Sequence, residues 1–375
     1  MHRSPHLSRA KLEADGASEE LALSMQERGE VLRQRGFPTL YTLKHLSLST
    51  GSDWGFLRSV IRRESRRAYS EFRIPKNTGG TRKISAPTAE LMQVQRWILD
   101  EILSRASRHP DSFAYHPKVR MTEAAERHIG ARWLIKADLH NFFPSISERR
   151  IYRLFSSFGY APLLAFEMAR ICTWPLGGAS TTSPNNMVAA PYPKKVVGVL
   201  PQGAPTSGAL ANLATWQLDN NLSSFAMSNG LVYTRYSDDI AFSSGGKFDR
   251  IRAGGHIRDI RRMVSQNGFS LHERKLHLIP PGARKVILGM LIQPDSIRIL
   301  PEQRRMLDLY IHSVRKYSLV SYAAKRKFDS PISFLNHVNG HLAHMKQIEP
   351  DWTAGREAAW IEALEEAGVF PGAMN

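Results

Sequence analysis

The chain has 375 residues, with 51 Lys and Arg against 34 Asp and Glu, so its formal net charge is +17. The 16 Phe, 11 Tyr and 7 Trp exclude a disordered basic tail, and the single cysteine excludes internal disulfides and multi-cysteine metal sites. No apolar run reaches the roughly 18 residues of a membrane span, and the N-terminus lacks a secretory signal. We therefore expect a soluble, cytoplasmic protein with a polyanionic partner, with nucleic acid favoured over a membrane surface.

The first third of the chain has mainly helical spacing of apolar residues. We expect a helix around residues 21–32 and a second helix over about 53–69. Residues 73–84 form two short β-like runs around Asn-Thr-Gly-Gly, which predicts a hairpin with a cationic tip. A further helix is expected over 91–103.

The centre of the chain predicts strands, and its end predicts helices. Residues 133–139 form a mostly apolar run, and 231–236 and 240–243 form two more, separated by Ser-Asp-Asp. Residues 175–199 are rich in Gly, Pro, Ser and Asn, which predicts a loop insertion. After residue 288 the spacing is mainly helical.

Three carboxylates stand at the ends of predicted strands. Asp238 and Asp239 lie side by side in a turn, and Asp138 ends a strand about 100 residues earlier. If the strands are neighbours, these carboxylates converge and repel, and a divalent cation relieves the repulsion. Two Mg²⁺ ions in such a site can stabilise the attacking and leaving oxygens of a phosphoryl transfer. Taken alone, the pair Asp238 and Asp239 is also typical of an acidic turn without a catalytic role.

Three sequence blocks occur in a fixed order: Asp-Leu-His-Asn-Phe-Phe-Pro-Ser-Ile at 138–146, Leu-Pro-Gln-Gly-Ala-Pro at 200–205 and Tyr-Ser-Asp-Asp at 236–239. This series resembles the reverse transcriptase family, whose palm contains an Asp followed by aromatics, a Pro-Gln-Gly block and Tyr-x-Asp-Asp. The resemblance covers roughly residues 30–345. Further similar segments are the fingers element at 73–87, the next palm motif at 271–275 and the primer-gripping hairpin at 285–292.

The resemblance implies an α+β right-hand polymerase fold, with fingers, a palm made of an antiparallel sheet plus helices, and a helical thumb. The implied domains are an N-terminal helical extension at 1–48, fingers at 49–132, a palm at 133–292 with an excursion at 147–199, and a thumb at 293–375. Basic clusters spread along the chain would line a template–primer groove, although each alone is also typical of a solvated helix face.

The resemblance also assigns metal ligands. Asp138, Asp238 and the backbone carbonyl of Leu139 would hold two Mg²⁺ ions, for which Mn²⁺ could substitute, and Asp239 would be an adjacent ligand or charge. Phe143 matches the steric gate, a ring that would clash with a 2′-hydroxyl, although it could instead be a core residue.

The remaining implied contacts are with substrates. No Gly-rich phosphate loop of the Walker type occurs, so cations must grip the phosphates. Lys275 matches a position that protonates the pyrophosphate leaving group, and an exposed lysine is equally plausible there. The other residues implied to contact the nucleotide are Arg82, Lys83, Gln202 and Gly203, and those implied to contact primer or template are Tyr236 and Gly289.

Within the family, the chain most resembles the retron type. Residues 124–128 match the retron pattern Asn-Ala-x-x-His at Ala125 and His128, and residues 287–289 match Val-Thr-Gly at Gly289 alone. The type implies a polymerase that uses deoxynucleotides to copy a cognate structured noncoding RNA into single-stranded DNA joined to RNA (msDNA). It also implies antiphage defence, with a possible effector protein.

Three alternatives stay open at this point. One is a retron-related defence enzyme with another priming route, and another is a group II intron-like reverse transcriptase. The third is an RNA-binding scaffold without activity, against which the intact Asp138, Asp238 and Asp239 argue.

Overall fold

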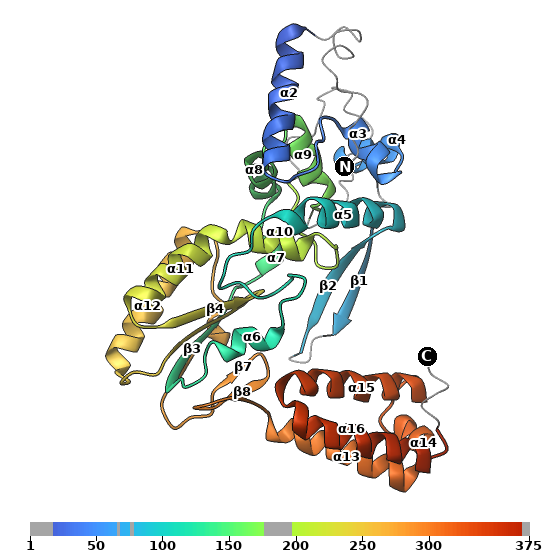
Figure 1. Cartoon of the computed structure of the whole chain (residues 1–375), viewed down its shortest axis with the longest axis vertical. Coiled ribbons are helices and arrows are strands. Elements are labelled where there is room, and N and C mark those ends of the chain that lie inside the picture. Colours follow the sequence, from blue (N-terminus) through green and yellow to red (C-terminus); the bar gives the residue numbers. More distant parts are fainter. Residues whose placement is uncertain (1–17, 66–67, 76–78, 176–196, 370–375) are drawn as a thin grey trace.

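The computed structural model describes residues 18–65, 68–75, 79–175 and 197–369. Apart from its ends, the loop predicted over 175–199 lies outside these residues, as do Asn77 and Thr78 of the predicted hairpin tip. The fold is α+β, and a central sheet lies between an N-terminal group of helices and a C-terminal helical bundle (Figure 1). In the part of the chain that is described, no helix is long and apolar enough to cross a membrane.

The N-terminal helices are α2 (Glu19–Gln34), α3 (Leu43–Thr50) and α4 (Trp54–Ile61), and α4 packs on α9 (Pro162–Ile171), which follows α8 (Glu148–Phe158). The helix predicted near residue 21 is confirmed. The helix predicted over 53–69 is wrong in length, because it ends at Ile61. The chain turns away at Arg63, whose φ is +63° and whose buried guanidinium lies 2.6 Å from Glu148.

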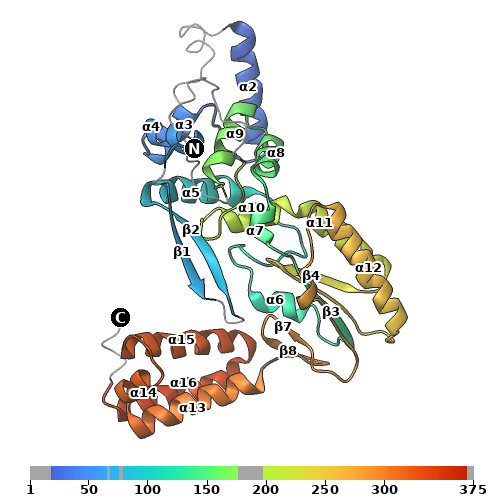
Figure 2. The ribbon, with the colours of Figure 1, turned by 180° about the vertical axis from the view of Figure 1, so that it is seen from behind.

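The predicted hairpin is confirmed as strands β1 (Tyr69–Pro75) and β2 (Thr81–Pro87), which pair antiparallel. Helix α5 (Ala89–Glu101) follows it, as the spacing over 91–103 predicted. The hairpin extends from α5 toward the C-terminal bundle in both views (Figures 1 and 2). Most residues of β1 are exposed, so this hairpin presents a large part of its surface to solvent.

The central sheet has four antiparallel strands in the order β4 (Val232–Tyr236), β5 (Asp239–Ser244), β3 (Trp133–Asp138) and β6 (His277–Ile279). Side chains alternate between its faces, so Ile135 and Phe242 join the main core, whereas Leu134 and Ala241 join the core under the C-terminal bundle. Helices α11 (Trp216–Ser228) and α12 (Arg250–Gln266) cover the main-core face. Shorter elements are η1 (Leu103–Arg105), α6 (Met121–Glu126), α7 (Phe142–Ser145), α10 (Ser207–Ala214) and η2 (Glu273–Lys275).

The chain after residue 288 is only partly as predicted. Two strands, β8 (Met290–Ile292) and β9 (Ile297–Ile299), lie between residue 288 and the first helix. Together with β7 (Val286–Ile287) they form a small antiparallel sheet. Strands of three residues are too short to give a clear alternation in the sequence. The helical prediction holds from residue 301, where a bundle begins that consists of α13 (Pro301–Tyr317), α14 (Leu319–Lys325), α15 (Pro331–Ile348) and α16 (Pro350–Glu366).

Candidate active site

Three carboxylates meet at one end of the central sheet. Strands β3 and β5 are neighbours, and their register places Asp138 opposite Asp239. Ser237 and Asp238 form the two-residue turn between β4 and β5, in which Ser237 has a φ of +59°. The backbone N–H of Leu139 donates to the carbonyl of Asp238 at 2.9 Å, which ties this turn to the end of β3. The register therefore brings the predicted acidic residues together.

The charges around this cluster are partly compensated by a lysine. Asp138 is buried, and its Oδ2 lies 2.6 Å from Nζ of Lys275. The hydrogen bond to Asp138 raises the pKa of Lys275, so this amine stays protonated. Asp239 remains exposed, and partial desolvation together with the negative charge of Asp238 raises its pKa. Within the described ranges, no three His, Cys, Asp or Glu side chains are arranged to hold a metal by themselves.

A buried arginine fixes the turn that carries Asp238. Arg235 Nε and Nη2 donate to the two carboxylate oxygens of Asp219 on α11, at 2.7 and 2.6 Å, and neither side chain of this pair is exposed. Nη1 of Arg235 donates to the carbonyl of Ser237 at 2.9 Å. Burial alone would lower the pKa of Arg235, but the charge of Asp219 outweighs it and the pKa is raised.

The other donors of Arg235 connect the turn to two further segments. Nη1 also donates to Oδ1 of Asn212 on α10, and Nη2 to Oγ of Ser112, both at 3.0 Å. Ser112 in addition forms a β-bridge with Arg235. Because the guanidinium has five N–H groups, these contacts use its full donor capacity. The turn is thus held rigidly against α10, α11 and the segment before α6.

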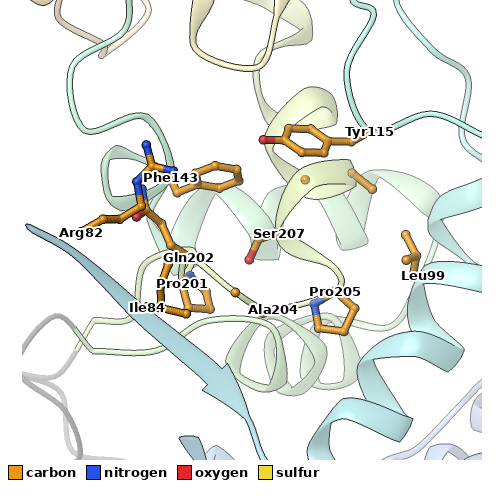
Figure 3. A pocket seen from close by; sticks show the side chains of 13 residues that line it. Arg82, Ile84, Leu99, Tyr115, Phe143, Pro201, Gln202, Ala204, Pro205 and Ser207 are labelled. Atoms are coloured by element: carbon orange, nitrogen blue, oxygen red, sulfur yellow. The ribbon is translucent and has the colours of Figure 1, made fainter. Parts of the chain in front are cut away.

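Figure 3 shows an open pocket of about 420 Å³, and Tyr115 in its wall connects it to the turn of Asp238, because the Tyr115 hydroxyl lies 2.8 Å from Oγ of Ser237. Phe143, on the short helix α7, is half-buried and both packs against the main core and lines this pocket. The ring of Tyr115 meets it edge-on, with centroids 6.0 Å apart. The other residues at the wall are Arg82, Ile84, Leu99, Pro201, Gln202, Gly203, Ala204, Pro205, Ser207, Gly208 and Ala209.

The Pro-Gln-Gly loop forms the side of the pocket that contacts the hairpin. The backbone N–H of Ser85 on β2 donates to the carbonyl of Gln202 at 2.7 Å. Gly203 has a φ of +114°, and a Cβ atom there would lie 2.8 Å from Cγ2 of Ile84. Only glycine combines this conformation with so close an approach. The resemblance implies that Gly203 contacts the nucleotide, and the structure shows that it lies close to β2.

The two predicted cations of β2 lie on opposite faces of the strand. Arg82 is exposed and lines the pocket, whereas Lys83 is not among the pocket residues and forms an ion pair with Glu71 of β1 at 2.8 Å. Neighbouring side chains of a strand alternate in direction, which accounts for the difference. The structure therefore brings Arg82, but not Lys83, to the pocket.

Comparison with known proteins identifies the family. The pattern that defines the family "Reverse transcriptase (RNA-dependent DNA polymerase)" matches residues 74–300, which is more than half of the chain. The chain belongs to the reverse transcriptase family. This enzyme is an RNA-directed DNA polymerase of the retron type.

The individual relatives are similar over most of their length. The reverse transcriptase of retron Ec86 from Escherichia coli is 27% identical over 337 residues, which are 89% of this chain and 93% of that protein. The reverse transcriptase of retron Mx65 from Myxococcus xanthus is 29% identical, over 85% of this chain and 71% of that one. Among solved structures, telomerase from Candida albicans has a TM-score of 0.42 at 10% identity, covering 81% of this chain and 61% of that chain, too weak a likeness to support any argument.

Of two further predicted residues of this reverse transcriptase, Tyr236 lies beside Asp239, and Gly289 belongs to a turn whose other residue contacts the same cleft. Tyr236 is half-buried and lines a small cleft together with Asp239 and with Leu288 of the β7–β8 turn. Leu288 and Gly289 form that turn with φ values of +48° and +79°. A glycine suits such a conformation. The structure thus places the β7–β8 turn against the Tyr-x-Asp-Asp hairpin.

The retron-like residues before β3 have structural roles. His128 is buried, with Nδ1 2.7 Å from Oγ of Ser243 on β5 and Nε2 2.7 Å from Oγ1 of Thr234 on β4. Burial lowers the pKa of His128 to about 3, so its imidazole is neutral. Ala125 is fully buried in the core under the C-terminal bundle. Both side chains are therefore part of the protein interior, where His128 connects β4 with β5.

Several residues at the site were missed by sequence reasoning. Arg235 interrupts an otherwise apolar strand, and this buried charge was a signal that could have been used. Asp219 lies on the apolar face of a helix and gave a similar signal. Tyr115 gave none, because it belongs to an irregular segment and meets Ser237 only in the folded chain.

Proposed function

We propose that this enzyme synthesises DNA at the cluster of Asp138, Asp238 and Asp239, copying a cognate structured noncoding RNA into single-stranded DNA. The observation that carries the assignment is the register that sets Asp138 opposite Asp239 with Asp238 in the adjoining turn. The pocket lined by Phe143 and Arg82, which Tyr115 connects to the turn of Asp238 through Ser237, has the size for a deoxynucleoside triphosphate.

The donor set fits Mg²⁺. This ion takes only one or two carboxylates and completes its shell with water and substrate phosphate oxygens, so a preformed three-residue cage is not required. Asp138, Asp238 and the carbonyl of Leu139 would hold two such ions, with Asp239 as a further ligand or charge, and Mn²⁺ could substitute. When bound, the ions make the primer hydroxyl more acidic and neutralise the triphosphate.

The protein groups around the reaction have distinct proposed tasks. Arg82, which lines the pocket from the hairpin, would bind the triphosphate, and Gln202 with Gly203, in the loop that contacts the hairpin, would contact the nucleotide. Phe143 would exclude a 2′-hydroxyl. Lys275 is protonated and lies beside Asp138, so it can donate a proton to the departing pyrophosphate.

The proposed division into lobes follows from these tasks. The palm would span 133–292 with the excursion at 147–199, the fingers 49–132, the thumb 293–375 and an N-terminal extension 1–48. The hairpin β1–β2 supports the fingers assignment, because β2 contributes Arg82 and Ile84 to the pocket. The bundle α13–α16 supports the thumb assignment, because it begins directly after the small β7–β9 sheet. Tyr236 and Gly289 would contact the primer from that side.

Retron-type synthesis would give a DNA joined to its RNA, and we propose a role in antiphage defence with a possible effector protein. The alternative is a different priming route, which gives unbranched DNA. The test is to sequence the nucleic acid that co-purifies with the wild-type enzyme and to treat it with a debranching activity. A branched RNA–DNA product supports the proposal, unbranched DNA supports the alternative, and the double variant Asp238→Ala with Asp239→Ala should yield RNA alone.

A further inference from the structure

Tyr115 occupies an unusual position beside the pocket. Its φ is +57°, a conformation that costs free energy for a residue with a side chain. Asn212 of α10 contacts both neighbours of Tyr115, because its Nδ2 donates to the backbone carbonyl of Ala114 at 2.5 Å and lies 3.3 Å from the side-chain Nε2 of His116. The backbone of Tyr115 is therefore held in one place by the helix that follows the Pro-Gln-Gly loop.

The side chain of Tyr115 joins the pocket to the turn that carries the carboxylates. Its hydroxyl lies 2.8 Å from Oγ of Ser237, the residue before Asp238. Its ring approaches Gly208 so closely that a Cβ atom there would lie 2.5 Å from Cγ of the ring. In Figure 3 the ring extends over the pocket toward Phe143, whose ring it meets edge-on at 6.0 Å.

We propose that Tyr115 is a second residue that determines sugar specificity, because it forms the pocket wall that keeps the Phe143 ring in the position that excludes a 2′-hydroxyl. The proposal rests on the proposed role of Phe143 as the steric gate. Among the described residues, the other ring that Phe143 contacts is that of Phe142, with centroids 5.5 Å apart, so Tyr115 limits the movement of the Phe143 ring on the remaining side. The bond to Ser237 in turn fixes the Tyr115 ring.

The experiment measures the ratio of kcat/KM for a deoxynucleotide to kcat/KM for the matching ribonucleotide. Tyr115→Ala should lower this ratio about two- to tenfold, as expected for the loss of one aromatic contact. Tyr115→Phe keeps the ring and removes the hydroxyl, so it should lower the ratio less and by the same factor as Ser237→Ala. The double variant Tyr115→Phe with Ser237→Ala should be no worse than either single variant. A general loss of stability would lower both kcat/KM values together and leave their ratio unchanged.

Two controls separate this inference from the function on which it rests. Tyr317 on α13 is as exposed as Tyr115, at 47% against 46%, and Tyr317→Ala should leave the ratio unchanged. If Phe143→Ala does not admit ribonucleotides, the proposed gate itself is wrong. If Phe143→Ala admits them while Tyr115→Phe and Tyr115→Ala keep the wild-type ratio, only the inference about Tyr115 is overturned. If Tyr115→Ala does not fold, the ratio measured for Tyr115→Phe is the test of the inference: a lowered ratio supports it, and the wild-type ratio overturns it.

Discussion

The substitution Asp219→Asn removes the only negative charge that is hydrogen-bonded to the buried guanidinium of Arg235 in the described structure. The change keeps the size of the side chain, so packing is conserved while the bidentate ion pair at 2.7 and 2.6 Å is lost. Because both side chains are fully buried, no solvent replaces the missing charge. Breaking such a pair costs about 3–5 kcal/mol, since it leaves a buried charge without compensation.

This cost is a large part of the 5–15 kcal/mol by which proteins are typically stable. We expect Asp219→Asn to lower the urea midpoint of unfolding by the equivalent of about 3–5 kcal/mol. The double variant Asp219→Asn with Arg235→Met removes both charges, so it should be more stable than Asp219→Asn alone. As a matched control, Asp259→Asn breaks the exposed pair with Arg262 on α12 and should not change the midpoint measurably. A loss below 1 kcal/mol for Asp219→Asn would refute the reasoning.

Three further variants test other parts of the site. Burial favours the neutral form of His128, so between its ordinary pKa and about 3 only the unfolded chain binds the proton, and the folded state loses stability as the pH is lowered. The wild type should therefore lose about 1 kcal/mol relative to His128→Gln between pH 7 and pH 5.5 in urea titrations. Gly203→Ala forces a Cβ atom against Ile84, so it should raise KM for the deoxynucleotide in primer extension. Lys275→Gln should lower kcat for incorporation about 10²- to 10⁴-fold with a smaller change in KM, because it removes the proton donor beside Asp138.

Each of these outcomes can be contradicted separately. If the stability of the wild type and that of His128→Gln depend on pH in the same way, the neutral imidazole of His128 does not cause the pH dependence. An unchanged KM in Gly203→Ala would mean that the loop and the hairpin can separate without consequence for the nucleotide. If Lys275→Gln retains the wild-type kcat, the ion pair with Asp138 has a structural role alone.

The acidic cluster could be predicted from the sequence, because each of its parts lies in a short contiguous motif. Asp138 ends an apolar strand, and Asp238 lies in a tight turn between two others, so the local pattern already fixes their positions on the sheet. The different directions of Arg82 and Lys83 could also have been predicted, since neighbours on a strand face opposite sides. The length of the helix after Asp53 could not be predicted, because it ends where Arg63 turns to reach Glu148, 85 residues away.

The supporting contacts of the site were beyond prediction for the same reason. Tyr115 meets Ser237 across 122 residues, and His128 meets Ser243 across 115. Only the tertiary fold brings these pairs together, and no periodicity of the local sequence records them. The match of Ala125 and His128 to the retron pattern was visible in the sequence. Only the structure shows that both residues are buried and that His128 connects β4 with β5.

The most direct test of the central claim is extension of a primer on an RNA template with Mg²⁺ and deoxynucleotides, comparing the wild type with the double variant Asp238→Ala and Asp239→Ala. RNA binding of both proteins is measured in parallel. We predict that the wild type extends the primer and that the double variant binds RNA normally but incorporates no nucleotide. Undiminished synthesis by the double variant would contradict the assignment of the reaction to these carboxylates.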